Sequence, residues 1–177
     1  TGGTGVFLSR TTLKAAVGDW IADESSAEAT HGDIRYWDVS AVDSLEDLFE
    51  GGKTNPLDFN ADIGAWDISA VTSMYRTFSY CTFGNTHSIS YWDTSNVVTM
   101  YETFKGALNF NQALIWDTSK VADMKNTFMY ARAFNSELAW DTAPAHPRVR
   151  RCQPRSPHID GAIVHRAEVQ RHVRYGP

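Results

Sequence analysis

Few side chains in this 177-residue sequence have the type and spacing that catalysis requires. The first 142 residues contain only two histidines, His31 and His87, and one cysteine, Cys81. No Ser, His and Asp set and no Cys and His pair stands in a catalytic context, and the sequence has neither a Gly-rich phosphate loop nor a helical metal motif. We therefore predict that the protein is not an enzyme and that it uses no cofactor.

Two groups of potential metal ligands are better explained without a metal. Cys81 and His87 lie in an irregular segment and supply only two ligands, fewer than a zinc site needs. Stacked Asp residues could bind Ca²⁺, but the oxygen-rich loop with alternating Asp and a Gly turn is missing. Four clustered acidic residues are predicted to form the solvated face of a helix: Asp19, Asp23, Glu24 and Glu28.

A tandem repeat marked by Trp-Asp dominates the sequence. The pairs begin at residues 37, 66, 92, 116 and 140, so the spacings are 29, 26, 24 and 24 residues. In the first four units Ser follows Trp by three residues, Val by five, Leu or Met by eight and Phe by twelve, without an insertion. Such a period indicates a repeat architecture. The predicted structural core is Trp37, Val42, Leu45, Phe49, Trp66, Val71, Met74, Phe78, Trp92, Val97, Met100, Phe104, Trp116, Val121, Met124, Phe128 and Trp140.

The spacing within a unit predicts a short helix followed by a short strand. Val, Met and Phe at i, i+3 and i+7 share one face of a helix of about ten residues. Runs such as FNADIGAW and FNQALIW, too short for another helix, predict a turn and a strand. The expected fold class is therefore an α/β repeat whose stacked helix-plus-strand coils form a solenoid. The predicted helix N-caps are Ser40, Ser69, Ser95 and Ser119.

Asparagine recurs at one position of the coil, as Asn60, Asn111 and Asn135. A stacked side-chain amide could hydrogen-bond the backbone of the bend there, so we predict a structural ladder. The segment before the third Trp-Asp departs from the pattern, because Phe83 is followed by Gly84 and Asn85 is displaced.

The domain organisation follows from where the repeat begins and ends. Residues 1–12 are predicted to be a flexible segment and residues 13–36 an N-terminal cap. Residues 37–142 form the solenoid, with four complete repeats and the start of a fifth. The predicted capping helix has apolar residues at helical spacing, at Leu13, Ala16, Val17, Trp20 and Ile21.

The composition changes abruptly after the fifth Trp-Asp. Residues 143–177 hold 7 Arg against Asp160 and Glu168, a net charge of 7 − 2 = +5, whereas the preceding residues carry 9 basic and 19 acidic side chains. A disordered basic arm that binds an acidic surface is one interpretation of this Pro-, Arg- and His-rich tail, and a truncated or misread coding region is the other, which the mid-unit loss of the repeat favours. Nucleic-acid binding is not expected, since no aromatic residues interleave with the arginines.

The pattern WDxSxVxxMxxxF followed by FNxxIxxW resembles the BspA family of leucine-rich-repeat-like surface proteins of bacteria and unicellular eukaryotes. The stretches LKAAVGDW and SAEATHGDI, within residues 13–36, resemble the segment that commonly precedes those repeats. The resemblance covers residues 13–142. It implies a right-handed leucine-rich-repeat-like solenoid and, for the better-known relatives, cell-surface display with roles in adhesion and protein binding. It supplies no catalytic residues.

We expect a non-enzymatic module that presents a surface for protein binding or adhesion, with a structural or self-assembling role as the alternative. The ligand, protein or glycan, is not identified by the sequence, and self-association is possible. A location at the cell surface or outside the cell follows from the resemblance alone, because the chain starts at Thr1 without a signal-peptide pattern and has no apolar run long enough to span a membrane. Candidate contact residues are Asp62, Gly64, Tyr75, Arg76, Ser90, Tyr101, Glu102, Ala113 and Ala139.

Overall fold

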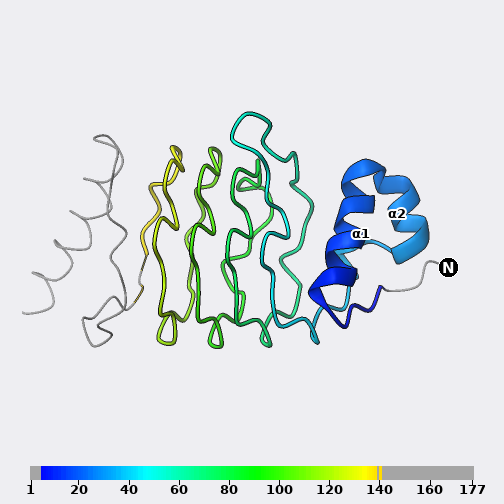
Figure 1. Cartoon of the computed structure of the whole chain (residues 1–177), viewed down its shortest axis with the longest axis horizontal. Helices are drawn as coiled ribbons and strands as arrows, with labels where there is room; N and C mark the ends of the chain where they lie inside the picture. The colour runs from blue at the N-terminus through cyan, green and yellow to red at the C-terminus, as the bar shows by residue number, and fades with distance from the viewer. Residues whose placement is uncertain (1–4, 139, 141–177) are drawn as a thin grey trace, which may run out of the picture.

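The computed structural model describes residues 5–138 and residue 140. Figure 1 shows two helices at the N-terminal end and, beside them, a row of stacked coils through which the chain winds. The helices are α1 (Arg10–Ala22) and α2 (Glu24–His31), and a short 3-10 helix, η1 (Ile34–Tyr36), leads into the first coil. The helices therefore cover one end of the stack.

Capping residues and an apolar stripe explain the two helices. The hydroxyl of Ser9 accepts a hydrogen bond from the backbone N–H of Thr12 and caps α1, while the carboxylate of Asp23 accepts from the N–H of Ser26 and caps α2. The buried residues of α1 follow the spacing that the sequence predicts: Leu13, Ala16, Val17 and Trp20. This stripe packs on the first coil, where the ring of Trp20 meets that of Trp37 edge-on with centroids 5.9 Å apart.

The coils contain neither the predicted helices nor the predicted strands. Beyond η1, the described part of the chain has no α-helix and no strand longer than an isolated bridge. The segment after each Trp-Asp is a series of turns, and coils pair at single parallel bridges such as Ser44 with Ser73 and Ser73 with Thr99. The predicted α/β solenoid of helix-plus-strand coils is therefore wrong, and no helix follows the four serines predicted to be N-caps: Ser40, Ser69, Ser95 and Ser119.

The direction of the backbone hydrogen bonds explains why no helix forms. The amides of alternate residues in the first coil donate to carbonyls of the second, as Phe49 does to Thr77 at 2.9 Å, and the same pattern joins the second coil to the third and the third to the fourth. In an α-helix each amide would instead donate to the carbonyl four residues earlier in its own segment. The chain thus satisfies these amides between coils, which isolated sequence periodicity does not reveal.

Recurrent left-handed residues interrupt any helix in the same segment. The tenth residue after Trp has a positive φ in each of four coils: 53° at Asp47, 52° at Arg76, 55° at Glu102 and 61° at Asn126. A right-handed helix cannot continue through such a residue. The side chains at i, i+3 and i+7 are nevertheless buried in all four coils, because the turns direct them inward without helical geometry.

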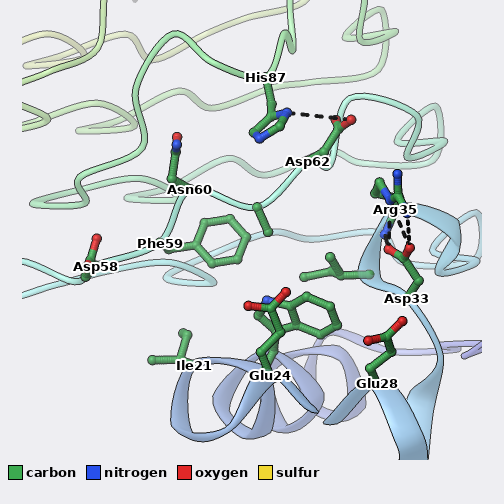
Figure 2. A pocket seen from close by; sticks show the side chains of 13 residues that line it. Ile21, Glu24, Glu28, Asp33, Arg35, Asp58, Phe59, Asn60, Asp62 and His87 are labelled. Carbon is green, nitrogen blue, oxygen red and sulfur yellow. Dashed lines mark hydrogen bonds and ion pairs between the residues drawn. The ribbon is translucent and has the colours of Figure 1, made fainter.

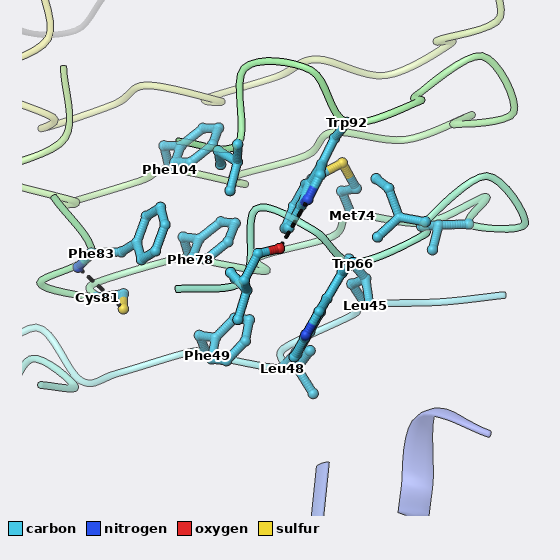
Figure 3. Packing of buried hydrophobic residues seen from close by; sticks show 14 of the residues in the cluster. Leu45, Leu48, Phe49, Trp66, Met74, Phe78, Cys81, Phe83, Trp92 and Phe104 are labelled. Carbon is cyan, nitrogen blue, oxygen red and sulfur yellow. Dashed lines mark hydrogen bonds between the residues drawn. The ribbon is translucent and has the colours of Figure 1, made fainter. Parts of the chain in front are cut away.

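Stacked phenylalanines form the centre of the core (Figure 3). The rings of Phe49, Phe78, Phe104 and Phe128 lie nearly parallel, with successive centroids 5.2, 5.3 and 5.4 Å apart. Each ring also lies against a second phenylalanine of the same coil, as Phe104 does against Phe110 at 4.0 Å. One aromatic position per coil thus becomes a continuous apolar column.

Tryptophan adds a second column and a polar bond between coils. The ring centroids of Trp92 and Trp116 are 6.3 Å apart and the rings are nearly parallel. The indole N–H of Trp116 donates to the backbone carbonyl of Ile89 at 2.9 Å, and that of Trp92 donates to the carbonyl of Ile63 at 3.2 Å. These two buried indoles therefore have the hydrogen-bond partner that their polar atom requires.

A ladder of buried threonines was not anticipated from the sequence. Thr77, Thr103 and Thr127, each eleven residues after Trp, are buried. Their hydroxyls donate to backbone carbonyls of the preceding coil at 3.0, 2.8 and 2.9 Å. The repeated offset was visible in the sequence, but Thr is most often a surface residue and nothing indicated its partner.

Replacing Phe104 by Ala is expected to destabilise the fold by about 3–5 kcal/mol, because Phe104 is fully buried and its loss leaves a cavity in the middle of the phenylalanine column. Urea unfolding followed by circular dichroism measures the change. Leu108→Ala, at a position 47% exposed, is the control and should change the free energy of unfolding by less than about 1 kcal/mol. Equal losses in the two variants would contradict the core assignment.

Candidate binding surfaces

An exposed row of side chains follows the residues that precede each buried Trp. Tyr36 is 64% exposed, Tyr91 83% and Ile115 66%, and the corresponding residue of the second coil is the small, exposed Ala65. We call Tyr36, Ala65, Tyr91 and Ile115 the outer row. Single exposed apolar side chains are normal on a protein surface, but a contiguous row of them can mark a contact surface. The constant position before Trp is visible in the sequence, but the residue types at that position vary, so the sequence alone does not mark it as a surface.

A row of carboxylates runs beside the outer row. Asp38, Asp67, Asp93 and Asp117 each follow a buried Trp and are all exposed; we call them the carboxylate row. The residue before Trp lies in η1 at Tyr36 and in a turn at Ala65 and Tyr91, and the Asp after Trp is exposed beside it. None of the four makes an ion pair among the described residues. The two rows therefore flank the buried tryptophans along the chain, and both are exposed.

The same aspartates shape the turn that follows. The Oδ1 atom of Asp38 accepts hydrogen bonds from the backbone N–H of Ser40 at 3.0 Å and from its hydroxyl at 2.7 Å. These two bonds, the hydroxyl bond first, lower the pKa of Asp38, and the bonds from Ser95 do the same for Asp93. The serine thus donates to an Asp-capped turn, the reverse of the helix-capping role that the sequence suggested.

Four of the predicted contact residues form one network on another face of the coils. The rings of Tyr75 and Tyr101 stack with centroids 5.1 Å apart, and the guanidinium carbon of Arg76 lies 5.0 Å from the centre of the Tyr75 ring. Arg76 Nε also lies 3.1 Å from a carboxylate oxygen of Glu102. These side chains come together as the shared offset implies, but they bind one another between coils.

Glu102 is the most buried member of that network. Its carboxylate also contacts Lys105 Nζ at 2.9 Å and the side-chain amide of Asn126 at 3.3 Å. Burial by itself would raise the pKa of Glu102, but the hydrogen bonds from Lys105 and Asn126 outweigh it and the pKa is lowered. An ionised, fully partnered carboxylate holds three coils together and offers little to a ligand.

The other predicted contact residues do not form one surface. Asp62 is half-buried and its carboxylate accepts from the N–H of Gly64 at 3.1 Å, a contact within the coil. Ser90 donates through its hydroxyl to the carbonyl of Ala113 in the next coil, and Ala113 itself is exposed. Ala139 and the tail, residues 143–177, lie outside the described residues.

An acidic pocket of about 700 Å³ lies between the helices and the first coils (Figure 2). Glu24 and Glu28 of α2 face it from one side, and Asp33, Asp58 and Asp62 from the other. Arg35 pairs with Asp33, and His87 Nδ1 lies 3.7 Å from a carboxylate oxygen of Asp62. No cluster of three or more potential metal ligands occurs in the described part of the chain. Of the predicted solvated cluster, Asp19 pairs with His31 and Asp23 caps α2, so only the two glutamates reach this pocket.

Cys81 lacks the environment of a reactive thiol. Its side chain is buried, and burial raises its pKa to about 12. Its sulfur lies 3.8 Å from the carbonyl oxygen of Phe59, to which it donates. A thiol that stays protonated is neither a good nucleophile nor a good metal ligand.

Asparagine side chains link successive bends. The Oδ1 atom of Asn60 accepts from the backbone N–H of Gly84 at 3.1 Å, and that of Asn111 accepts from the N–H of Asn135 at 2.7 Å. Asn85 occupies the intermediate rung, since its Oδ1 atom accepts from the N–H of Asn111 at 2.7 Å. The irregular segment before Trp92 thus keeps the ladder, although its sequence departs from the repeat.

These features define a tandem-repeat protein whose coils are joined by backbone and side-chain ladders. Residues 53–149, more than half of the chain, match the family described as "Mycoplasma protein of unknown function, DUF285". The chain belongs to this family. No curated protein and no solved structure gave a significant match. None of the helices within the described ranges is long and apolar enough to cross a membrane.

Acid should weaken the fold partly through the carboxylate row. A carboxyl group whose pKa is lower in the folded than in the unfolded chain stabilises the fold above its unfolded pKa of about 4, and this contribution is lost as the pH falls through the folded pKa. Hydrogen bonds from the following serines lower the pKa values of Asp38, Asp93 and Asp117.

The triple variant Asp38→Asn, Asp93→Asn and Asp117→Asn is therefore expected to lose less unfolding free energy than the wild type between about pH 6 and pH 3. Asparagine keeps the acceptor oxygen of the turn, so the variant should fold. Urea unfolding at both pH values measures the difference. An unchanged acid dependence would show that these three bonds contribute nothing to it.

Proposed function

We propose that this protein is a non-enzymatic binding module whose ligand is a protein and whose contact surface is the outer row. The observation that carries the proposal is the exposure of Tyr36, Tyr91 and Ile115 on a frame whose other recurrent side chains are buried or hydrogen-bonded between coils. Tyrosine is favoured at protein interfaces because it combines a large apolar surface with a polar hydroxyl. Repeat proteins commonly bind through such rows, since neighbouring coils bring equivalent positions together.

We also propose that the protein is not an enzyme. The buried Cys81 thiol has a raised pKa, and His31 is held between Asp19 and the ring of Trp37. Asp19 can orient the His31 ring, but within the described residues no hydroxyl or thiol bonds to that ring, and Cys81 bonds to backbone groups. A structural scaffold with variable exposed positions accounts for these observations better than an active site does.

The proposed location is the cell surface. Its support is the BspA-like repeat pattern, whose better-known relatives are surface proteins involved in adhesion and protein binding. Membership of the family matched by residues 53–149 is compatible with this pattern, and the family's function is not established. The close relationship to BspA proteins is accordingly part of the proposal.

A site-specific photo-cross-linker tests the function. A benzoylphenylalanine is placed at Tyr91 in the outer row or, as a control, at Tyr130, which is 40% exposed and lies outside that row. Each chain is irradiated with surface and secreted proteins of the organism that makes it. We expect a discrete heterologous protein to cross-link from Tyr91 but not from Tyr130, because only Tyr91 lies in the proposed interface.

A competition control makes the result specific. Unlabelled wild-type chain should abolish the cross-link, and the triple variant Tyr36→Ser, Tyr91→Ser and Ile115→Ser should not. Cross-links only to a second copy of the chain would favour the alternative, a self-assembling structural component. Identical products from both positions, or none, would reject the outer row as the binding surface.

A further inference from the structure

Trp20 differs from the other tryptophans in its hydrogen bonding. The remaining indole N–H groups each donate to a backbone carbonyl, namely those of Trp37, Trp66, Trp92, Trp116 and Trp140. Trp20 is only 8% exposed and lines the acidic pocket, yet its N–H has no hydrogen-bond partner within the described residues. In that part of the chain, the side-chain polar atoms that are both enclosed and unpaired are Asp47 Oδ1 and Thr118 Oγ1. The Trp20 N–H is therefore accessible, and it is a donor that a ligand in the pocket can use.

Two carboxylates of the same pocket also lack a partner. Glu24 and Glu28 lie about one turn apart on α2, and neither forms an ion pair with a described residue. Figure 2 shows both side chains directed from the helix toward the pocket. The pocket holds five carboxylates and only one guanidinium, that of Arg35, which is already paired with Asp33. Its charge therefore favours a cationic ligand.

The size and the remaining lining of the pocket suit an organic cation. Ile21, 38% exposed, and the buried Ile34 and Phe59 supply apolar surface among the charged groups. The volume of about 700 Å³ lies within the range of ordinary ligand sites. No three potential metal ligands converge anywhere in residues 5–138. The dispersed carboxylates thus fit an extended ligand with an apolar stem better than a single metal ion.

We propose that the acidic pocket receives a basic residue, Arg or Lys, of the partner protein. The cationic group pairs with Glu24 and Glu28, and the backbone carbonyl of the same residue accepts a hydrogen bond from the Trp20 N–H. The methylene stem between them covers Ile21. This inference rests on the proposed function, and it adds a second contact site and the class of side chain that enters it.

The pocket adjoins the outer row, which favours a residue presented by a protein over a free small cation. Arg35 lines the pocket, and its guanidinium carbon lies 5.4 Å from the centre of the Tyr36 ring. Tyr36 is the first member of the outer row and is 64% exposed. A protein that covers Tyr36 therefore lies beside the pocket. The unpaired Trp20 N–H supports the same choice, because a peptide supplies a carbonyl acceptor that a simple alkyl cation lacks.

The test follows the indole N–H signals of the isotope-labelled full chain by nitrogen–proton correlation NMR. The signal that is absent from the Trp20→Phe variant belongs to Trp20, and it should also exchange fastest with deuterated water because the other indoles are hydrogen-bonded. The probe is N-acetyl-arginine N-methylamide, which carries the guanidinium, the stem and the carbonyls of a single residue. We expect it to shift the Trp20 signal saturably and to leave the signals of Trp92 and Trp116 in place.

Two matched compounds separate the contributions to binding. The citrulline analogue of the probe has a similar shape without the charge, and we expect it to bind about tenfold more weakly. Butylguanidinium keeps the charge and the stem but has no carbonyl. We expect it to bind about fivefold more weakly than the probe and to leave the Trp20 signal almost unmoved, because one hydrogen bond is lost.

Matched variants locate the binding. Glu24→Gln with Glu28→Gln should weaken binding of the arginine probe about tenfold, since both cationic contacts are lost. The charge-matched control Asp38→Asn with Asp93→Asn removes two charges from the carboxylate row, outside the pocket lining, and should leave the dissociation constant within about twofold of the wild-type value. Unfolding curves of all variants establish that each is folded.

Several outcomes would overturn the inference. Equal losses in the two double variants would show attraction to net charge alone, and saturable binding with an unmoved Trp20 signal would reject the bond to its indole. Butylguanidinium that binds as tightly as the arginine probe would make the pocket a site for free small cations. If the probe does not bind while Tyr91 still cross-links to a protein, this inference fails and the proposed function stands. If the probe binds and Tyr91 does not cross-link, the outer row is rejected and the pocket remains.

Discussion

Backbone hydrogen bonds directed from coil to coil are the constraint on which the rest of this structure depends. Every second amide of the turn segment donates to a carbonyl of the next coil, as Leu45 does to Ser73 and Met74 does to Thr99. A coil of this kind has few bonds of its own and is stable only when a neighbour pairs with it. The turn segment must therefore keep the same length in every unit, and the length differences fall between Phe and the next Trp, where such pairing is sparse.

The same constraint aligns equivalent side chains into columns. Phenylalanine and tryptophan stack face to face, buried threonines donate to the preceding coil, and asparagines accept from the following one. A charged side chain links coils in the same way: Glu102 is ionised and buried, and it is paired with groups from two neighbouring coils. Most recurrent polar groups are thus already hydrogen-bonded between coils. A ligand therefore has to bind at positions that do not take part in these bonds.

The residue before each Trp meets this requirement, whereas the Asp after it also accepts hydrogen bonds that shape the following turn. Trp is buried and its neighbours face outward, so Tyr91 and Asp93 are exposed however well the core is packed. Their rows inherit the spacing of the coils, because the residues between them are locked in the tryptophan column. A rigid surface lowers the conformational entropy lost on binding. At the N-terminal end, α1 and α2 cover the first coil and create the acidic pocket where helix and coil surfaces diverge.

Sequence periodicity determined the repeat, the buried side chains and the N-terminal helix, because these depend on which residues are apolar and how often they recur. It also identified the asparagine ladder, although Asn85 had to be placed by the structure. The backbone of the coil was predicted wrongly, since burial at i, i+3 and i+7 is compatible with a helix and equally with turns that pass through a left-handed residue such as Arg76. Only contacts between coils distinguish the two, because the amide of Arg76 bonds to Tyr101, 25 residues later in the chain. For the same reason, only the stack of coils shows that the exposed residues before successive tryptophans form one row.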